Sequence, residues 1–158
     1  MAVLDRSGAI SFGLPFMDRA RARFTRRLSR VDEAGRAALP AAWRDLLDCA
    51  AEHFACEDIW MRASGFAECK DHSVQHRVVL EVMREGAVHA AEGRLLQVRE
   101  MAHQLKDWYE THASTMDAQL ARHLRNSRSG RRNGDVRPQV SVATRPPWRA
   151  PAQHAFSR

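Results

Sequence analysis

Three pairs of polar side chains most strongly constrain how this chain folds. The pairs are His53 with Glu57, His72 with His76, and His112 with Asp117. In each of the first two pairs the members are four residues apart, so on an α-helix they project from one face. Imidazoles and carboxylates delivered from three segments of a short chain are typical of a metal site inside a helical bundle.

Apolar residues recur with a helical period through most of the chain and predict four helices. The expected helices run from Phe16 to near Gly35, from Pro40 to Gly65, from Lys70 or Asp71 to a loop between Gly86 and Gly93, and from Arg94 to about Leu124. A proline suits the first turn of a helix, and a glycine suits the position just after its end. There is no strand signal. We therefore predict an all-α, up-down-up-down four-helix bundle.

The predicted metal ligands fall on the inward faces of these helices. On the second helix, the apolar stripe through Phe54 and Met61 also contains His53 and Glu57. A buried carboxylate costs several kcal/mol unless it is paired or binds a metal. Glu57 on the second helix and Asp117 on the fourth helix therefore both need such a partner. Imidazoles combined with carboxylates suit iron, zinc or copper better than calcium or magnesium.

The positive charge is concentrated at the C-terminal end. The chain carries 25 basic and 19 acidic side chains, a net charge of +6. Residues 125–158 hold eight arginines and one aspartate, which leaves the rest of the chain close to neutral. We expect an N-terminal arm over 1–15, a four-helix domain over 16–124, and a disordered Arg/Pro-rich tail over 125–158. This distribution argues against specific nucleic-acid binding and leaves open a partner protein that contacts the tail.

The cysteines and the hydropathy pattern indicate the cellular compartment in which we expect the protein. Cys49, Cys56 and Cys69 are an odd number, and no secretory leader is recognisable, so we expect reduced thiols in a cytoplasmic protein. No apolar run approaches the ~18 residues that span a bilayer. A zinc site from Cys56, Cys69, His72 and His76 is an alternative, but Cys56 lies off the His53 face, and small buried hydrophobes are the simpler interpretation of the cysteines.

Taken together, the motifs of residues 12–124 resemble hemerythrin-like proteins, particularly single-domain bacterial hemerythrins. The shared motifs are Gly13-Leu14-Pro15-Phe16-Met17-Asp18, His53-Phe54-x-x-Glu57-x-x-x-Met61, Gly65-Phe66, His72-x-x-x-His76 and Trp108-x-x-x-His112-x-x-x-x-Asp117. The resemblance implies a four-helix bundle around a non-haem di-iron centre that binds O2 reversibly. It also implies that one iron is held by three histidines, that the other is held by His53, and that the two carboxylates bridge them. The three histidines are His72, His76 and His112.

One expected ligand is absent. The family places a histidine three residues after the aspartate of its first-helix motif, and counting from Asp18 that position is Arg21. Arginine stays protonated and does not bind metals. The missing ligand belongs to the iron at which the family binds O2. Three outcomes follow from this: two irons bind with Arg21 turned outward, one metal binds at the three histidines, or the site is degenerate.

The three possible outcomes for the site lead to three expectations about function. The first is a non-enzymatic protein that binds or senses O2, or a similar small ligand, through two irons or one, with O2 binding altered by the lost histidine. An enzyme is the alternative, because a vacant coordination position would admit peroxide or nitric oxide for scavenging. A metal-free interaction bundle, in contact with a partner through its basic tail, is the third.

Overall fold

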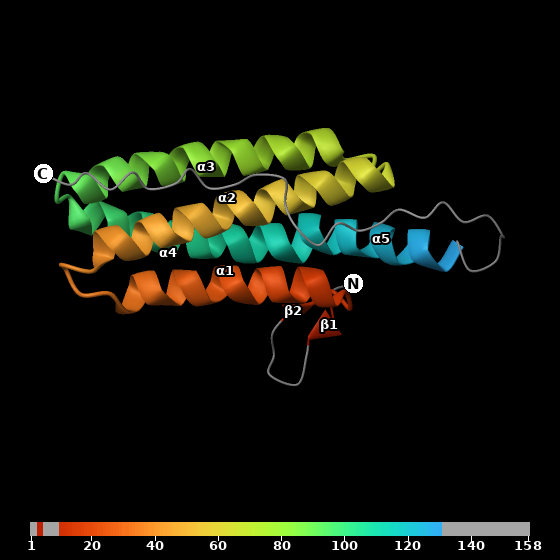
Figure 1. Ribbon diagram of the computed structural model, residues 1–158, viewed down its shortest axis with the longest axis horizontal. Coiled ribbons are helices and arrows are strands. Elements are labelled where there is room, and N and C mark those ends of the chain that lie inside the picture. Colours follow the sequence, from red (N-terminus) through yellow and green to blue (C-terminus); the bar gives the residue numbers. More distant parts are fainter. Residues whose placement is uncertain (1–2, 5–9, 131–158) are drawn as a thin grey trace, which may run out of the picture.

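The computed structural model describes residues 3–4 and 10–130, and its described part is dominated by long helices (Figure 1). They are α1 (Pro15–Glu33), α2 (Leu39–Ser64), α3 (Cys69–Ala91) and a fourth rod made of α4 (Leu95–His112), the π-helical η1 (Ala113–Asp117) and α5 (Ala118–Gly130). Successive rods run in opposite directions (Figure 1). The predicted all-α, up-down-up-down four-helix bundle is confirmed.

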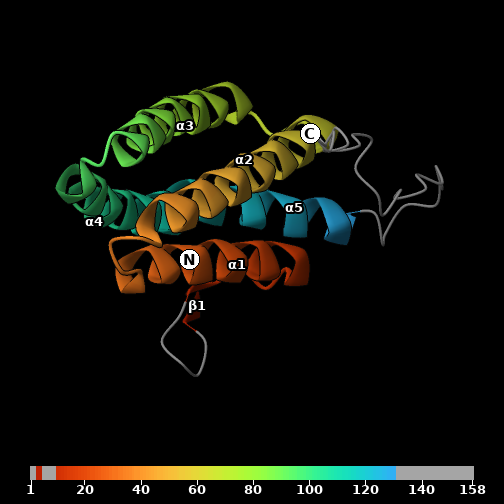
Figure 2. The same ribbon diagram turned by 60° about the vertical axis from the view of Figure 1, so that its left-hand side comes forward.

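The rods pack as a square. In both views α1 and α3 lie on opposite sides of the bundle, and α2 and the fourth rod each contact both of them (Figure 1, Figure 2). The buried apolar side chains form two clusters along the bundle axis, one containing Phe54 and Leu105 and the other containing Met61 and Leu120. On α2, Glu57 lies between Phe54 and Met61. The polar residues therefore occupy the level where the two apolar clusters meet.

The N-terminal arm is tied to α1 by the motif that precedes the helix. Asp18 accepts hydrogen bonds from the backbone N–H of Phe12 (2.7 Å) and from the Ser11 hydroxyl (3.3 Å). The arm also contains a short antiparallel pairing of β1 (Val3–Leu4) with β2 (Ile10–Ser11). Strands of two residues are too short to show an alternating pattern in the sequence, and this pairing leaves the all-α class unchanged.

The helix ends follow the glycine and proline signals in most places. The second helix stops before Gly65, whose φ of 67° is left-handed, a conformation that glycine adopts without strain. The third helix differs from the prediction, since it passes through Gly86 and continues to Ala91. A Cβ at Gly86 would lie 2.4 Å from Cζ2 of Trp43. The glycine therefore permits close packing of α3 against the indole and does not end the helix.

The fourth rod is longer than predicted. It continues past Leu124 to Gly130, and Arg125, which we had placed in the tail, donates a hydrogen bond to the carbonyl of Phe12. This contact joins α5 to the N-terminal arm. The rest of the predicted tail, residues 131–158, lies outside the described residues, as do most of residues 1–9. The expected disorder of the tail and its expected contact with a partner stay predictions.

Two sequence expectations about location can be compared with this fold. Within the described residues, no helix is long and apolar enough to cross a membrane. All three cysteines fall within the described part of the chain, and none of them forms a disulfide. The cytoplasmic location inferred from the thiols stays a prediction.

Candidate metal centre

The second and third helices bring their polar pairs together by the four-residue spacing. One carboxylate oxygen of Glu57, Oε1, lies 3.3 Å from Nε2 of His53 on the same helix. Its other oxygen, Oε2, lies 3.2 Å from Nε2 of His76 on α3. His72 is one turn away from His76, and its Nε2 lies 3.9 Å from the same Oε2. Glu57 thus stands between His53 on one side and the two α3 histidines on the other.

The pair on the fourth rod depends on a local change in helix type. His112 and Asp117 are five residues apart, and in a regular α-helix their side chains would point about 140° away from each other. Between them the chain forms one π-helical turn, in which residues five apart share a face. Oδ1 of Asp117 consequently lies 3.2 Å from Nε2 of His112. Single π-turns inside α-helices occur frequently at functional sites.

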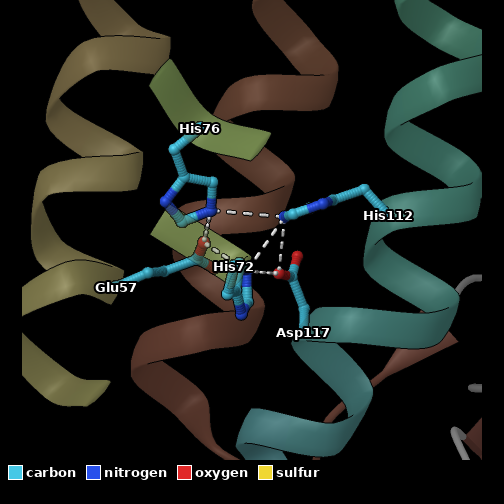
Figure 3. Close-up of side chains that lie close together, drawn as sticks. All are labelled: Glu57, His72, His76, His112 and Asp117. Atoms are coloured by element: carbon cyan, nitrogen blue, oxygen red, sulfur yellow. Dashed lines mark hydrogen bonds and ion pairs between the residues drawn. The ribbon is translucent and has the colours of Figure 1, made fainter. Parts of the chain in front are cut away.

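Five of the six predicted ligands converge on one point (Figure 3). Each offers a nitrogen or oxygen atom that lies within 4.8 Å of all the others; the five are Glu57, His72, His76, His112 and Asp117. Nε2 of His112 lies 3.0 Å from Nε2 of His72 and 3.3 Å from Nε2 of His76. Donor atoms bound to one ion at bonds of about 2.1 Å lie about 3.0 Å apart at right angles and about 3.4 Å apart at the tetrahedral angle. The spacing is that of ligands around a single ion.

The environment of these residues favours neutral imidazoles. All six predicted ligands are at most 2% exposed. Burial lowers the pKa of His53 to about 4, against the opposing effect of the Asp117 carboxylate. Burial, together with the neighbouring imidazoles of His72 and His112, lowers the pKa of His76 to about 3. At pH 7 both rings are neutral, which is the form that binds metals.

The pKa values of the two carboxylates in the cluster are shifted in opposite directions. Burial, and then the nearby carboxylates of Asp117 and Asp58, raise the pKa of Glu57 well above its ordinary value. Burial acts in the same direction on Asp117, but contact with the imidazoles of His112 and His72 outweighs it and holds its pKa below the usual range. Oδ2 of Asp117 is buried with no hydrogen-bond partner among the described residues. A bound cation would satisfy that oxygen and would favour the anionic form of Glu57.

Outer partners fix two of the histidine rings. Nδ1 of His76 lies 3.1 Å from Oδ1 of Asp58, which also accepts a 2.7 Å hydrogen bond from the Ser73 hydroxyl. Nδ1 of His112 lies 3.4 Å from Oε1 of Gln75. With Nδ1 acting as the donor, each ring directs the lone pair of Nε2 into the cluster. Metal-binding histidines are commonly oriented in this way.

Comparison with known proteins agrees with this geometry. Over 120 residues the chain is 30% identical to a bacteriohemerythrin of Ralstonia nicotianae (strain ATCC BAA-1114 / GMI1000), an alignment that covers 76% of this chain and 88% of that protein. The chain belongs to the hemerythrin-like family. No protein-family model matches it, and no solved structure does.

Within this hemerythrin-like bundle, His53 lies apart from the other five predicted ligands. Among the residues that the structure describes, its Nε2 lies 3.3 Å from Oε1 of Glu57, the contact that links it to the cluster, and 3.5 Å from the hydroxyl of Tyr109. Arg21, at the position of the missing histidine, is half-buried on α1, and it lines a cavity of about 80 Å³ together with Tyr109. The outcome in which two irons bind with Arg21 turned outward stays a prediction.

Sequence reasoning missed three polar residues around the site: Asp58, Gln75 and Tyr109. The first two adjoin predicted ligands in sequence, but nothing in their spacing distinguishes them from solvated helix residues. Tyr109 had a usable signal, because it precedes His112 by three residues and so shares its face. The alternative zinc site gains no support, since neither Cys56 nor Cys69 belongs to the cluster.

Proposed function

We propose that this hemerythrin-like protein binds non-haem iron at the cluster and uses it to bind or sense O2 or a similar small ligand. The observation that carries the proposal is the convergence of three imidazole nitrogens and two carboxylates at ligand-to-ligand distances in a buried site. In this assignment His72, His76 and His112 hold one iron. Glu57, Asp117 and His53 would hold a second iron.

The residues present fit iron on chemical grounds. The donor set combines neutral imidazoles with hard carboxylate oxygens and contains no thiolate, a combination that suits iron. The unpartnered Oδ2 of Asp117 and the two separately directed oxygens of Glu57 suit carboxylates that contact two cations. Bound iron would supply the electrons and the open coordination position for a small ligand.

The protein contributes orientation and the exclusion of water. Phe54 stacks on the ring of His76 with centroids 4.3 Å apart, and Trp108 stacks on His112 at 4.6 Å. These aromatic faces hold the imidazole planes and cover the three-histidine side of the cluster with apolar surface. A dry pocket of this kind slows side reactions of a reduced metal with solvent.

A route for a small ligand lies on the other side. A surface groove of about 530 Å³ runs between α1 and α2, and its lining includes Ala20, Trp60 and the edge of His53. Of the six predicted ligands, only His53 lines this groove, so the His53 side of the cluster lies nearest to it. That side is also the one at which the family's usual first-helix histidine is replaced.

Anaerobic reduction of the iron-loaded protein followed by titration with O2 tests this proposal. We expect a visible absorption change on O2 binding, but weaker binding or faster autoxidation than hemerythrins show, because the second iron has one imidazole fewer. Full and stable reversibility would contradict the expected impairment. A protein that takes up no iron would remove the proposal and would favour the metal-free interaction bundle.

The groove also keeps the scavenging alternative open. It would bring peroxide or nitric oxide close to the His53 side, where the chain supplies the fewest imidazoles. If the protein is a scavenger, iron-loaded protein will turn over one of these substrates, and His53→Ala will abolish that turnover. Absence of turnover with either substrate would leave O2 binding or sensing as the function.

A further inference from the structure

Tyr109 occupies the position from which another ligand could reach the second iron. It lies on α4, one turn before His112, and its side chain is 3% exposed. The phenol ring stacks on Phe24 of α1 with centroids 4.0 Å apart, which fixes its plane. This packing directs Oη to a point 3.5 Å from Nε2 of His53.

The distance separates two interpretations of this contact. Hydrogen bonds from hydroxyl groups have donor–acceptor distances of about 2.5–3.0 Å, so 3.5 Å is long for one. Two donor atoms that bind one ion at about 2.1 Å lie about 3.0–3.4 Å apart, which is close to the observed value. Nε2 of His53 lies 3.3 Å from Oε1 of Glu57 as well. Around His53, the neighbouring oxygens are therefore spaced as co-ligands.

We propose that Tyr109 binds the iron beside His53 through its phenolate oxygen and replaces the histidine absent at position 21. The inference rests on the proposed function, since it concerns the second iron of the same centre. On binding, the O–H bond of the phenol breaks, an iron–oxygen bond forms, and the proton leaves to solvent. Tyrosinate is an established type of ligand to iron in proteins, and as an anionic oxygen donor it favours the ferric state.

Arg21 gains a role in this arrangement. It lines the same small cavity as Tyr109, so a permanent positive charge lies on the side of the ring that faces α1. A positive charge there would oppose a ligand-poor iron but complement a negative charge on Oη. Arg21 on α1 and a phenolate on α4 would therefore complement each other in charge across this cavity.

Resonance Raman spectroscopy of the ferric, iron-loaded protein tests the proposal, with iron per chain measured on the same sample. Tyr109 is the only tyrosine in the chain, so any tyrosinate-to-iron charge-transfer band must arise from it. We expect such a visible band, with enhanced tyrosinate vibrations that shift when the protein is labelled with ring-deuterated tyrosine. The labelling identifies the ligand without any substitution, so the test does not depend on a variant that folds.

Variants then measure the contribution of the hydroxyl. Tyr109→Phe keeps the ring that stacks on Phe24 and should lose the band and most of the second iron while retaining the first. Thr111→Val is the matched control, because it removes an exposed hydroxyl of the same helix that contacts only the backbone carbonyl of Asp107. This control should keep both the band and the iron.

The outcomes distinguish this inference from the proposed function. Two irons per chain without a tyrosinate band would overturn the role of Tyr109 and leave the iron proposal standing. A single iron per chain without the band would also overturn the role of Tyr109, and it would leave an iron protein whose metal is confined to the three histidines. A chain that binds no iron would remove both.

Discussion

The two ends of the cluster are built differently. At the three-histidine end, His72, His76 and His112 point their Nε2 atoms at one another, and two of these rings are oriented by Asp58 and Gln75. At the His53 end a single imidazole remains, and Nδ1 of that ring has no hydrogen-bond partner among the described residues. Glu57 contacts both ends. The imidazoles of the first end are thus already oriented towards one another, while on our proposal the other end would rely on the carboxylates and on Tyr109 to hold a metal.

Because of this difference, we expect a substitution at one end to leave iron binding at the other end intact. The three-histidine end is covered by Phe54 and Trp108, whereas the His53 end borders the groove between α1 and α2. On our proposal, the shielded end would hold its metal more tightly, and the end that borders the groove would admit the small ligand. The following predictions test this division.

The largest effect is expected from removing a ligand at each end. His112→Asn should lower iron affinity by more than about 100-fold, because loss of an outer partner alone costs about 10–100-fold and loss of a ligand costs more. Iron per chain should fall towards zero. His53→Asn should retain the iron of the three-histidine end. Equal iron loss in the two variants, with helicity preserved, would show that the ends are not independent.

Restoring the missing imidazole should strengthen the weaker end. Arg21→His adds a neutral imidazole at the His53 end, so we expect the occupancy of the second iron to rise towards one per chain. Arg30→His, an exposed substitution near the end of α1, is the matched control. If metal analysis finds the same iron content in Arg21→His as in the parent protein, the first-helix ligand does not limit the His53 end.

Loss of an outer partner should weaken the stronger end. Asp58→Ala removes the carboxylate that contacts Nδ1 of His76, and we expect iron affinity there to fall about 10–100-fold. Competition with a chelator measures this change. Asp48→Ala, which alters an exposed carboxylate on the same helix, should leave the affinity unchanged. An unchanged affinity in Asp58→Ala would show that packing alone orients His76.

The smallest effect concerns the metal-free protein at low pH. The pKa of His53 is about 4 in the fold against an ordinary 6.5, so below pH 6.5 the unfolded chain binds more protons than the folded chain. The contribution of His53 to stability is therefore largest above pH 6.5 and decreases as the pH falls towards 4. Between pH 7 and pH 5 this amounts to about 2 kcal/mol.

Urea unfolding in the presence of a chelator measures this contribution. His53→Asn should lose less stability than the parent protein on going from pH 7 to pH 5, by roughly the 2 kcal/mol given by the pKa difference. His103→Asn, at an exposed position on α4, is the control. Parallel pH dependence of His53→Asn and the parent protein would mean that burial does not suppress the charge of His53.

The sequence predicted the elements whose signals are local. Four-residue spacing placed His72 and His76 on one buried face, and the αL end of α2 at Gly65 followed from its glycine. Gly86 was misinterpreted because a helix break and a close approach of Trp43 both require the same residue. A glycine alone does not distinguish them, since the indole that fills the space comes from another helix.

In the site as well, contacts between helices could not be predicted from residue spacing. The contact between His112 and Asp117 depends on the π-helical turn Ala113–Asp117, which the expectation of one regular helix from Arg94 to Leu124 did not include. The contact between Asp58 and His76 depends on the relative position of α2 and α3, which residue spacing does not encode. The proximity of Tyr109 to His53 likewise becomes visible only when the helices are packed.

The central claim is that iron occupies this cluster and binds first at the three-histidine end. Anomalous diffraction at the iron edge, from crystals of the iron-loaded protein, tests it most directly. We expect one strong peak bonded to Nε2 of His72, His76 and His112, and a second, weaker peak beside His53. A bundle with no peak at these histidines, or with its stronger peak beside His53, would contradict the account.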